Sequence, residues 1–236
     1  MNSEYFFQKL DKWDKKTILK YNGYGGKSFT FLLKGISILG RETIWLTLIV
    51  LFMFIWYDRV LFSFIASTFL IGTIIIASIK KLIGRDRPFE TLQNIKVLER
   101  KPSSRSFPSW HAYNVMSQGL IIIYLNPYPW LIIIIFILIG LVAFSRIQLG
   151  VHYPTDVIFG ALMGIIGFFV SMFILAPIII NILIYFEQIT TIEIQFQKIN
   201  SLLFENLLYS LFVVGLYIII ILVAVLKKIR DFLSIR

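Results

Sequence analysis

The chain has 236 residues, of which 58% are hydrophobic and only 15% are charged. About a quarter of the residues in a soluble domain are charged, so this composition excludes an ordinary soluble protein and indicates a polytopic membrane protein. The lack of cysteine excludes disulfides and thiolate metal sites, and the net charge of +10 fits loops that set membrane topology, so we expect no nucleic-acid partner.

Residues 1–35 are predicted to form an amphipathic arm on the membrane surface, because aromatic and aliphatic side chains alternate with lysines. An ordinary solvated arm is an equally good interpretation of this charge pattern. The glycine-rich segment 21–26 is expected to break any helix within the arm. The first twenty residues lack the apolar core and the small-residue cleavage site of a secretory signal, so we expect no processing.

Residues 36–236 are predicted to form one membrane-embedded domain with an all-α fold, a bundle of about six transmembrane helices. A span needs about 20 residues to cross about 30 Å of hydrocarbon, and some of the apolar segments are shorter. The prolines within 126–129 predict a helical hairpin with a tight turn. After Leu175 the chain either extends the fifth helix or lies along the interface. The six apolar segments are 43–57, 60–79, 112–125, 130–144, 157–175 and 207–226.

Three polar clusters lie at the predicted helix ends, in the order KKLIGRDRP, PSWH and SRIQLGVHYPTD. Counting alternate crossings places Lys80, His111, Arg146 and His152 at the same membrane face, although they are far apart in the sequence. These are the only two histidines of the chain, and both fall inside the clusters. Two imidazoles at one face, beside the cationic side chains of the same clusters, favour catalysis over a structural role.

These three clusters, in this order, resemble the motifs of the type 2 phosphatidic acid phosphatase family, and the resemblance covers about residues 36–175. That family shares its fold with vanadium haloperoxidases and bacterial acid phosphatases. The resemblance implies that His152 is the nucleophile and that His111 is the general acid that protonates the leaving oxygen. A neutral imidazole attacks phosphorus, and water then hydrolyses the phosphohistidine. Asp156 is expected to orient and stabilise His152, although a carboxylate in a first helical turn is also favourable by itself.

A site for phosphoryl transfer requires fixed cations and hydrogen-bond donors around the phosphate, because the transfer spreads negative charge over the phosphate oxygens. The predicted cations are Lys80, Arg87 and Arg146. Lys81 and Arg85 fall outside this spacing and are interpreted as side chains that snorkel at a helix end. Ser109 and the backbone N–H groups that open the third span are predicted to contact the phosphate, and Ser145 has a weaker claim.

Trp110 departs from the family pattern, which has glycine at this position. A tryptophan here has ordinary backbone angles, pushes the phosphate away slightly or stacks over the interfacial substrate entrance, and we keep it in the predicted phosphate-binding set without expecting a loss of activity. No cluster of Asp, Glu and His has ligand spacing, so we predict neither a metal nor a cofactor. Asp86 and Glu90 are interpreted as local partners of nearby Arg and Lys.

All lysines and arginines except Arg59 and Lys198 lie on the active-site side if the six crossings are right. The positive-inside rule then favours a cytoplasmic active site in the cell membrane, whereas many bacterial members of the resembled family are expected to act on the outer face. The substrate class is a phosphorylated lipid in the bilayer, and phosphatidic acid, phosphatidylglycerol phosphate, a polyprenyl diphosphate and a lipid A phosphate stay open, as does the oligomeric state. The alternatives are a vanadate-dependent haloperoxidase and a non-catalytic headgroup binder or transporter.

Overall fold

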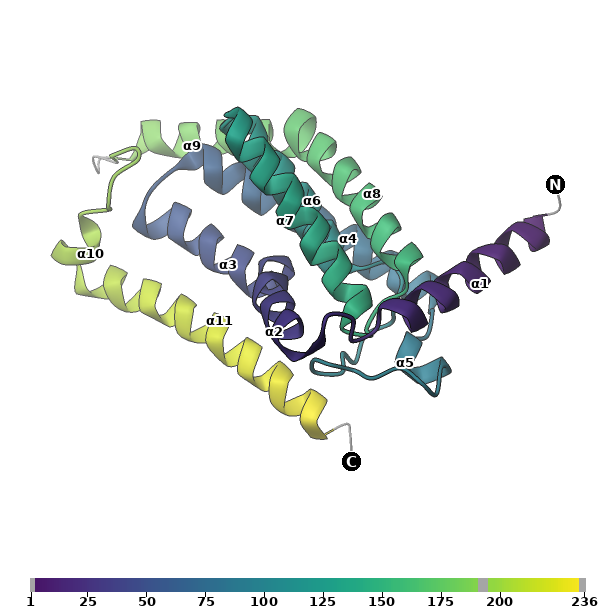
Figure 1. Cartoon of the computed structure of the whole chain (residues 1–236). Helices are drawn as coiled ribbons and strands as arrows, with labels where there is room; N and C mark the ends of the chain where they lie inside the picture. Colours follow the sequence, from purple (N-terminus) through teal and green to yellow (C-terminus); the bar gives the residue numbers. More distant parts are fainter. Residues whose placement is uncertain (1–2, 191–194, 234–236) are drawn as a thin grey trace. The chain divides into compact units, whose positions relative to one another are not determined.

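The computed structural model describes residues 3–190 and 195–233. Regular structure in these ranges is helical, which confirms the predicted all-α fold (Figure 1). Contacts divide the chain into two compact units, a first of residues 1–41 with 72–167 and a second of residues 42–71 with 168–236. The helices are α1 (Ser3–Tyr21), α2 (Gly26–Ile36), η1 (Ser37–Gly40), α3 (Glu42–Val50), η2 (Leu51–Ile55), α4 (Arg59–Ile83), α5 (Pro88–Thr91), α6 (Trp110–Leu125), α7 (Pro129–Gln148), α8 (Pro154–Val170), η3 (Ser171–Leu175), α9 (Ala176–Ile189), α10 (Leu202–Glu205) and α11 (Leu207–Leu233).

Four helical stretches of the described chain are long and apolar enough to cross a membrane, and the protein is a multi-pass membrane protein. The pair formed by α2–η1 and α3–η2 counts as a fifth if it is one span. The predicted count of about six is higher because it included α6, whose 16 residues are short of the about 20 that a span requires. The four stretches are Arg59–Thr91, Pro129–Gln148, Pro154–Ile189 and Leu207–Leu226.

The question that the sequence left open after Leu175 has a definite answer. The helix that begins at Pro154 continues to Ile189 through the π-helical turn η3. Pro177 lies in the first turn of α9. Proline removes one backbone donor and crowds the preceding turn, and a local change to π-helical hydrogen bonding accommodates it without ending the helix. The fifth predicted helix therefore extends beyond Leu175, which is one of the two alternatives that the sequence left open.

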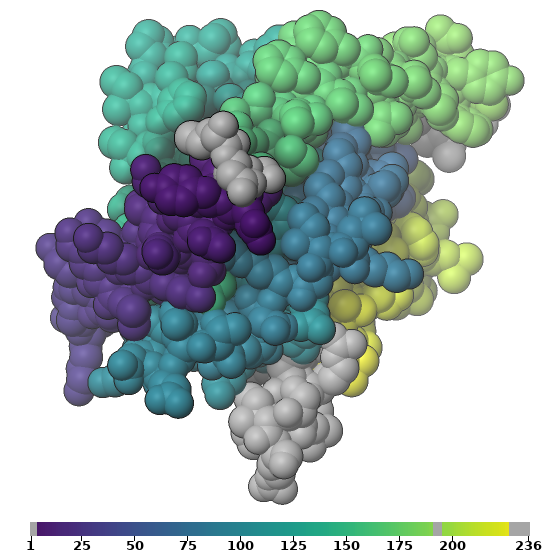
Figure 2. Space-filling model, turned by 90° about the vertical axis from the view of Figure 1, so that its right-hand side faces the viewer, coloured from purple at the N-terminus to yellow at the C-terminus, as the bar shows by residue number. Residues whose placement is uncertain are grey.

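The first unit contains the predicted hairpin. Helix α6 ends at Leu125, α7 begins at Pro129, and the two pack against each other, as predicted. Buried aliphatic side chains fill the interface between them, namely Val115, Ile135, Ile139 and Val142. The turn between α1 and α2 confirms the helix break predicted at 21–26. In Figure 2 the purple N-terminal segment lies beside the blue-green segment that follows α4, in agreement with the hydrogen bonds of Asn22 to the backbone of Lys96.

A glycine face on α8 lets α6 approach closely. A Cβ at Gly160 would lie 2.4 Å from the carbonyl oxygen of Ser109, and one at Gly164 would lie 2.8 Å from the carbonyl oxygen of Tyr113. Both separations are too short for any larger residue. In addition, the backbone N–H of Ser109 donates to the carbonyl of Asp156 at 2.9 Å. The first turns of α6 and α8 are therefore held side by side.

The second unit has a polar clamp at the start of α4. Asp58 is buried, and its Oδ1 accepts hydrogen bonds from the backbone N–H groups of Val60 and Leu61 at 3.0 and 2.9 Å, which caps the helix. Its Oδ2 accepts from the Gln197 amide at 2.9 Å. The clamp thus ties the loop before α10 to the start of α4.

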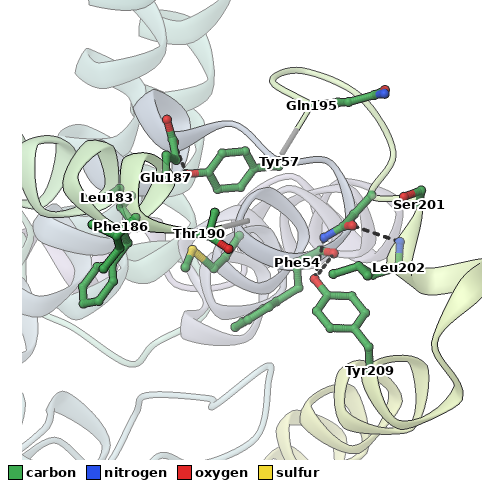
Figure 3. A pocket seen from close by; sticks show the side chains of 13 residues that line it. Phe54, Tyr57, Leu183, Phe186, Glu187, Thr190, Gln195, Ser201, Leu202 and Tyr209 are labelled. Carbon is green, nitrogen blue, oxygen red and sulfur yellow. Dashed lines mark hydrogen bonds between the residues drawn. The ribbon is translucent and has the colours of Figure 1, made fainter. Parts of the chain in front are cut away.

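A cavity of about 520 Å³ opens within the second unit beside this clamp (Figure 3). Apolar side chains such as Phe54, Leu183 and Phe186 line much of it. The polar side chains at its edge are already bonded to one another: the Tyr57 hydroxyl donates to Glu187 at 2.5 Å, and the Tyr209 hydroxyl donates to the carbonyl of Phe54 at 2.8 Å. Both histidines of the chain lie in the first unit, so the candidate chemistry must be sought there.

Candidate active site

The predicted site residues come from four helix ends of the first unit. Lys80 lies in the last turn of α4 and Arg146 in the last turn of α7. His111 lies in the first turn of α6, and His152 lies in the turn between α7 and α8. The backbone N–H of His152 donates to the carbonyl of Arg146 at 3.2 Å, and His111 is close enough to both residues for their charges to interact. The structure therefore brings together side chains that the sequence spreads over more than 70 residues.

The His152 ring is held between a guanidinium and a hydroxyl. Its Nε2 lies 3.3 Å from Nη1 of Arg87, and its Nδ1 lies 3.4 Å from the hydroxyl of Ser106. A guanidinium can only donate, so Nε2 accepts and the ring proton belongs on Nδ1. The lone pair of Nε2 consequently points toward the cationic side of the site, which is the orientation that a nucleophile for phosphorus requires.

The charge state of His152 suits the same role. The side chain is buried, and burial together with the neighbouring charges of Arg87, Lys80 and Arg146 holds the pKa of His152 well below its usual value of 6.5. The ring is therefore neutral at neutral pH. A neutral imidazole keeps the lone pair that attacks phosphorus, whereas an imidazolium has none.

Asp156 is fully buried in the first turn of α8 and faces the opposite side of the ring. Its Oδ2 lies 3.5 Å from Nδ1 of His152 and accepts hydrogen bonds from the Ser106 hydroxyl at 2.5 Å and from the Tyr153 backbone at 2.9 Å. The separation from the ring is long for a direct hydrogen bond, and Ser106 bridges the gap. The carboxylate thus faces His152 both directly and through Ser106.

Arg87 is buried, and its guanidinium is bonded mainly to the protein. It donates to the carbonyl of Ser104 at 2.7 Å, to the Ser104 hydroxyl at 3.2 Å and to the carbonyl of Val151 at 2.7 Å. A weaker contact of 3.4 Å reaches the carbonyl of Arg105. Only the N–H that points at Nε2 of His152 faces the ring. Arg87 therefore anchors the loop 92–109, and only its Nη1 contacts Nε2 of His152.

Arg146 differs from Arg87, because two of its N–H donors have no acceptor among the described residues. Its side chain is 1% exposed, and Nη2 donates to the carboxylate of Glu99. Its Nε and Nη1 are buried without a hydrogen-bond partner among the described residues. Buried donors without partners cost about 1–3 kcal/mol each, so they mark a place where an acceptor is expected. These two N–H groups point to different sides of the guanidinium, so each is available to a separate acceptor, such as one oxygen of a phosphate.

The remaining predicted phosphate ligands divide into two groups. Lys80 is partly exposed, and its Nζ donates to the carbonyls of Arg105 and Ser106 at 2.5 and 3.3 Å. The Ser109 hydroxyl accepts from the backbone N–H of Ala112 at 3.4 Å, so its own proton stays available. Ser145 differs, because its hydroxyl donates to the carbonyl of Val142 at 2.6 Å within α7. Ser145 is therefore bonded to its own helix in this structure.

His111 is partly exposed and packs on the end of η1. A Cβ at Gly40 would lie 2.7 Å from the Cβ of His111, so only glycine leaves room for the imidazole. Asn114 fixes this contact by donating to the carbonyl of Gly40 at 3.1 Å. Arg41, which follows Gly40, is exposed, and its charge acts on both His111 and Arg146.

Trp110 is the first residue of α6 and has ordinary helical geometry. The indole stacks on the Tyr113 ring, with centroids 5.7 Å apart and planes at 15°. Of the alternatives considered for Trp110, ordinary backbone angles are the one observed, because the backbone here does not adopt the left-handed conformation that would favour glycine.

Replacing Trp110 with glycine is expected to destabilise the protein without raising its activity. Glycine costs a helix about 0.5–1 kcal/mol relative to alanine, and the variant also loses the stack on Tyr113. Thermal unfolding and lipid phosphate turnover in detergent measure the two effects. A large gain in turnover would instead mean that the indole obstructs the substrate.

The interpretation of Arg85 as a snorkelling side chain is wrong. Its guanidinium donates to Asp156 and to Asp14, both at 2.7 Å, and so belongs to the site. Ser106 and Glu99 were also missed, because both lie in a loop whose fold the sequence does not reveal. The interpretation of Asp86 as a local partner is confirmed by its ion pair with Arg105. Glu90 instead caps α5, because its carboxylate accepts from the backbone N–H of Arg87 at 2.6 Å.

Comparison with known proteins identifies a family. The sequence model of the PAP2 superfamily matches residues 59–180. An undecaprenyl-diphosphatase of Sulfolobus acidocaldarius is 32% identical over 133 residues, which cover 56% of this chain and 64% of that protein, so the match spans just under two thirds of the relative's length.

Two crystal structures share the fold. The Aquifex aeolicus LpxE structure has a TM-score of 0.59 and 24% sequence identity, and the match covers 66% of this chain and 93% of that one. A transmembrane PAP2 type phosphatidylglycerolphosphate phosphatase from Bacillus subtilis has a TM-score of 0.53 and 22% identity, with 78% and 89% covered. These identities support the fold and leave the substrate to be argued from the site.

Proposed function

This chain belongs to the PAP2 superfamily, and we propose that it is a membrane phosphatase that removes a terminal phosphate from a lipid through a phosphohistidine intermediate. The observation that carries the proposal is the buried, neutral His152, whose Nε2 faces Arg87 while its Nδ1 faces Ser106 and Asp156. A nucleophile, a group that orients it and a set of cations then surround one place where phosphorus can sit.

The reaction proceeds in two steps. In the first, the lone pair of Nε2 of His152 forms a bond to phosphorus, the bond from phosphorus to the leaving oxygen breaks, and His111 donates a proton to that oxygen. His111 enters this step as an imidazolium: burial and the surrounding cations lower its pKa, and the negative charge of a bound phosphate opposes that shift. In the second, water attacks phosphorus, His111 takes up a proton from the water, and the P–N bond breaks to release inorganic phosphate. Asp156 stabilises the positive ring in between, as the third group does for other activated nucleophiles.

Charge stabilisation comes from the protein's own cations. Lys80, Arg87 and Arg146 surround the ring, and Arg146 supplies the two open N–H groups. Fixed donors of this kind stabilise the equatorial oxygens of the transferring group. The residues described contain no group of three His, Cys, Asp or Glu side chains suited to a metal ion. We propose that the reaction needs no added metal.

The leaving group is proposed to be anionic, which favours a lipid diphosphate among the phosphorylated lipids considered. The carrying observation is Arg41, an exposed cation directly after Gly40, the residue on which His111 packs, and His111 is the residue proposed to protonate the leaving oxygen. A second phosphate next to the scissile bond would lie where this cation attracts it. The similarity to an undecaprenyl-diphosphatase supports the same class.

A panel of phosphorylated lipids tests the function. Purified protein in detergent, with EDTA present, is expected to release inorganic phosphate, and faster from a polyprenyl diphosphate than from phosphatidic acid, phosphatidylglycerol phosphate or a lipid A phosphate. Binding of these lipids without any release would establish a headgroup binder or transporter instead. Halide oxidation with vanadate and peroxide but no phosphate release would establish the haloperoxidase alternative.

The active site is proposed to face the cytoplasm, because the counted charge asymmetry obeys the positive-inside rule. Lys96 and Lys198 are both exposed, and the chain has no cysteine of its own. In intact cells, Lys96→Cys is expected to be shielded from an impermeant thiol reagent, and Lys198→Cys is expected to be labelled. Permeabilised cells, in which both should react, provide the control. The reverse pattern in intact cells would place the site on the outer face.

A further inference from the structure

The N-terminal helix α1 buries one carboxylate. Asp14 is 1% exposed and Ile18, one turn later, is fully buried, whereas Trp13 and Leu19 on the other side of the helix are exposed. A buried carboxylate is costly unless donors surround it. Asp14 accepts from the backbone N–H of Thr155 at 2.9 Å, from the Thr155 hydroxyl at 2.5 Å and from Nη2 of Arg85 at 2.7 Å. Its partners thus lie at the start of α8 and just after α4.

Arg85 connects this carboxylate to the one that faces His152. While Nη2 donates to Asp14, Nη1 donates to Oδ1 of Asp156 at 2.7 Å. The guanidinium also lies over the Tyr153 ring, 4.1 Å from its centroid. The contacts therefore run without a break from Asp14 through Arg85 to Asp156, whose other oxygen lies 3.5 Å from Nδ1 of His152.

A purely structural ion pair would not need this arrangement, because replacing a buried ion pair with apolar side chains is often neutral or stabilising. Here one guanidinium is shared between two buried carboxylates, so it neutralises neither completely. If Asp14 were uncharged, Arg85 would turn toward both oxygens of Asp156. It would then compete with Ser106 for Oδ2 and reduce the negative charge that faces the ring.

We propose that Asp14 is a positioning residue for phosphoryl transfer: acting through Arg85, it holds Asp156 in the orientation and with the residual negative charge that His152 requires. The proposal rests on the proposed function. It gives the N-terminal arm a part in the reaction, although no atom of the arm needs to touch the substrate.

The test compares two substitutions on the same helix. Asp14→Asn keeps the shape of the side chain and removes its charge, and it is expected to lower kcat about tenfold, the size typical for loss of a group one step removed from the reacting centre. KM for the lipid should stay close to wild type, whereas the unfolding temperature should fall, because the amide nitrogen of asparagine cannot accept the hydrogen bonds that one carboxylate oxygen accepts here. Asp11→Asn is the matched control, because Asp11 is half-exposed and pairs with Lys15, one turn later on the same helix, at 2.6 Å. It should leave kcat unchanged.

A double-mutant cycle with Arg85→Lys separates action through Arg85 from an independent effect. If Asp14 acts through Arg85, then Asp14→Asn lowers kcat little further once Arg85 is replaced. Losses that multiply would overturn the proposal, and so would a kcat for Asp14→Asn equal to that of an active wild type. A kcat for Asp14→Asn that returns to the wild-type value when both proteins are assayed well below their unfolding temperatures would also overturn it. An inactive wild type would instead show that the proposed function has failed.

Discussion

Replacing His152 with alanine is expected to lower kcat for lipid phosphate release by at least about 10⁴-fold, the scale on which hydrolases lose activity with their nucleophile. The reason is that Nε2 supplies the electron pair that forms the P–N bond, and no other described side chain takes that position beside Arg87. Released phosphate and the amount of phosphoenzyme trapped in alkaline denaturant measure the loss. Alkaline conditions are needed because the P–N bond is labile in acid.

Two control measurements, the unfolding temperature and the affinity for phosphate, test whether the alanine variant is still folded and still binds phosphate. Since His152 is buried but carries no charge at neutral pH, its removal should leave the unfolding temperature in detergent within a few degrees of wild type. Competition by inorganic phosphate for a bound lipid phosphate should also persist, because Arg146 is intact. An alanine variant that still forms phosphoenzyme would show that another residue is the nucleophile, and the proposed mechanism would then be wrong.

The meeting of the site residues could be predicted because helices have a fixed rise and a membrane has a fixed thickness. Counting crossings placed Lys80, His111, Arg146 and His152 at one face, and all four lie together in the first unit. The count holds because α6 and α7 pack against each other as a hairpin, so α6 reverses the direction of the chain although its 16 residues are fewer than a span requires.

The partners of these residues could not be predicted in the same way. Arg85 and Arg87 are two positions apart, and spacing alone assigned Arg87 to the phosphate and Arg85 to the membrane interface. In the structure Arg87 mainly binds the loop 92–109, and Arg85 binds Asp156. What decides this is Asp14, a carboxylate 71 residues earlier whose position depends on how α1 packs. Sequence patterns predict which face of a helix is buried, but they do not predict which distant side chain contacts that face.

The N-terminal arm is a second place where the sequence pattern predicted the helix but not its contacts. Its alternation of aromatic residues and lysines predicted an interfacial helix, and exposed side chains such as Tyr5, Phe7 and Trp13 still fit a membrane surface. Asp14 interrupts that pattern with one negative charge on the face that packs against the first unit. A charge that is out of place in an amphipathic helix was therefore the available signal, and only its partners give it meaning.

Replacing Arg146 with lysine is expected to lower kcat by about 10²- to 10³-fold, the range observed when one preorganised donor to a developing anion is removed. Lysine keeps the charge and can still pair with Glu99, but it lacks the planar fork whose Nε and Nη1 are open. A control is Arg105→Lys, because Arg105 is exposed and its guanidinium pairs with the exposed Asp86. It should retain wild-type turnover.

The measurement that separates binding from stabilisation of the transition state is the comparison of KM with kcat/KM for the Arg146→Lys variant. If the fork grips the phosphoryl oxygens mainly while phosphorus is being transferred, kcat and kcat/KM fall together and KM changes little. A rise in KM with unchanged kcat would mean that Arg146 only holds the substrate in the ground state. Turnover equal to wild type would mean that the buried, open N–H groups of Arg146 do not face the phosphate at all.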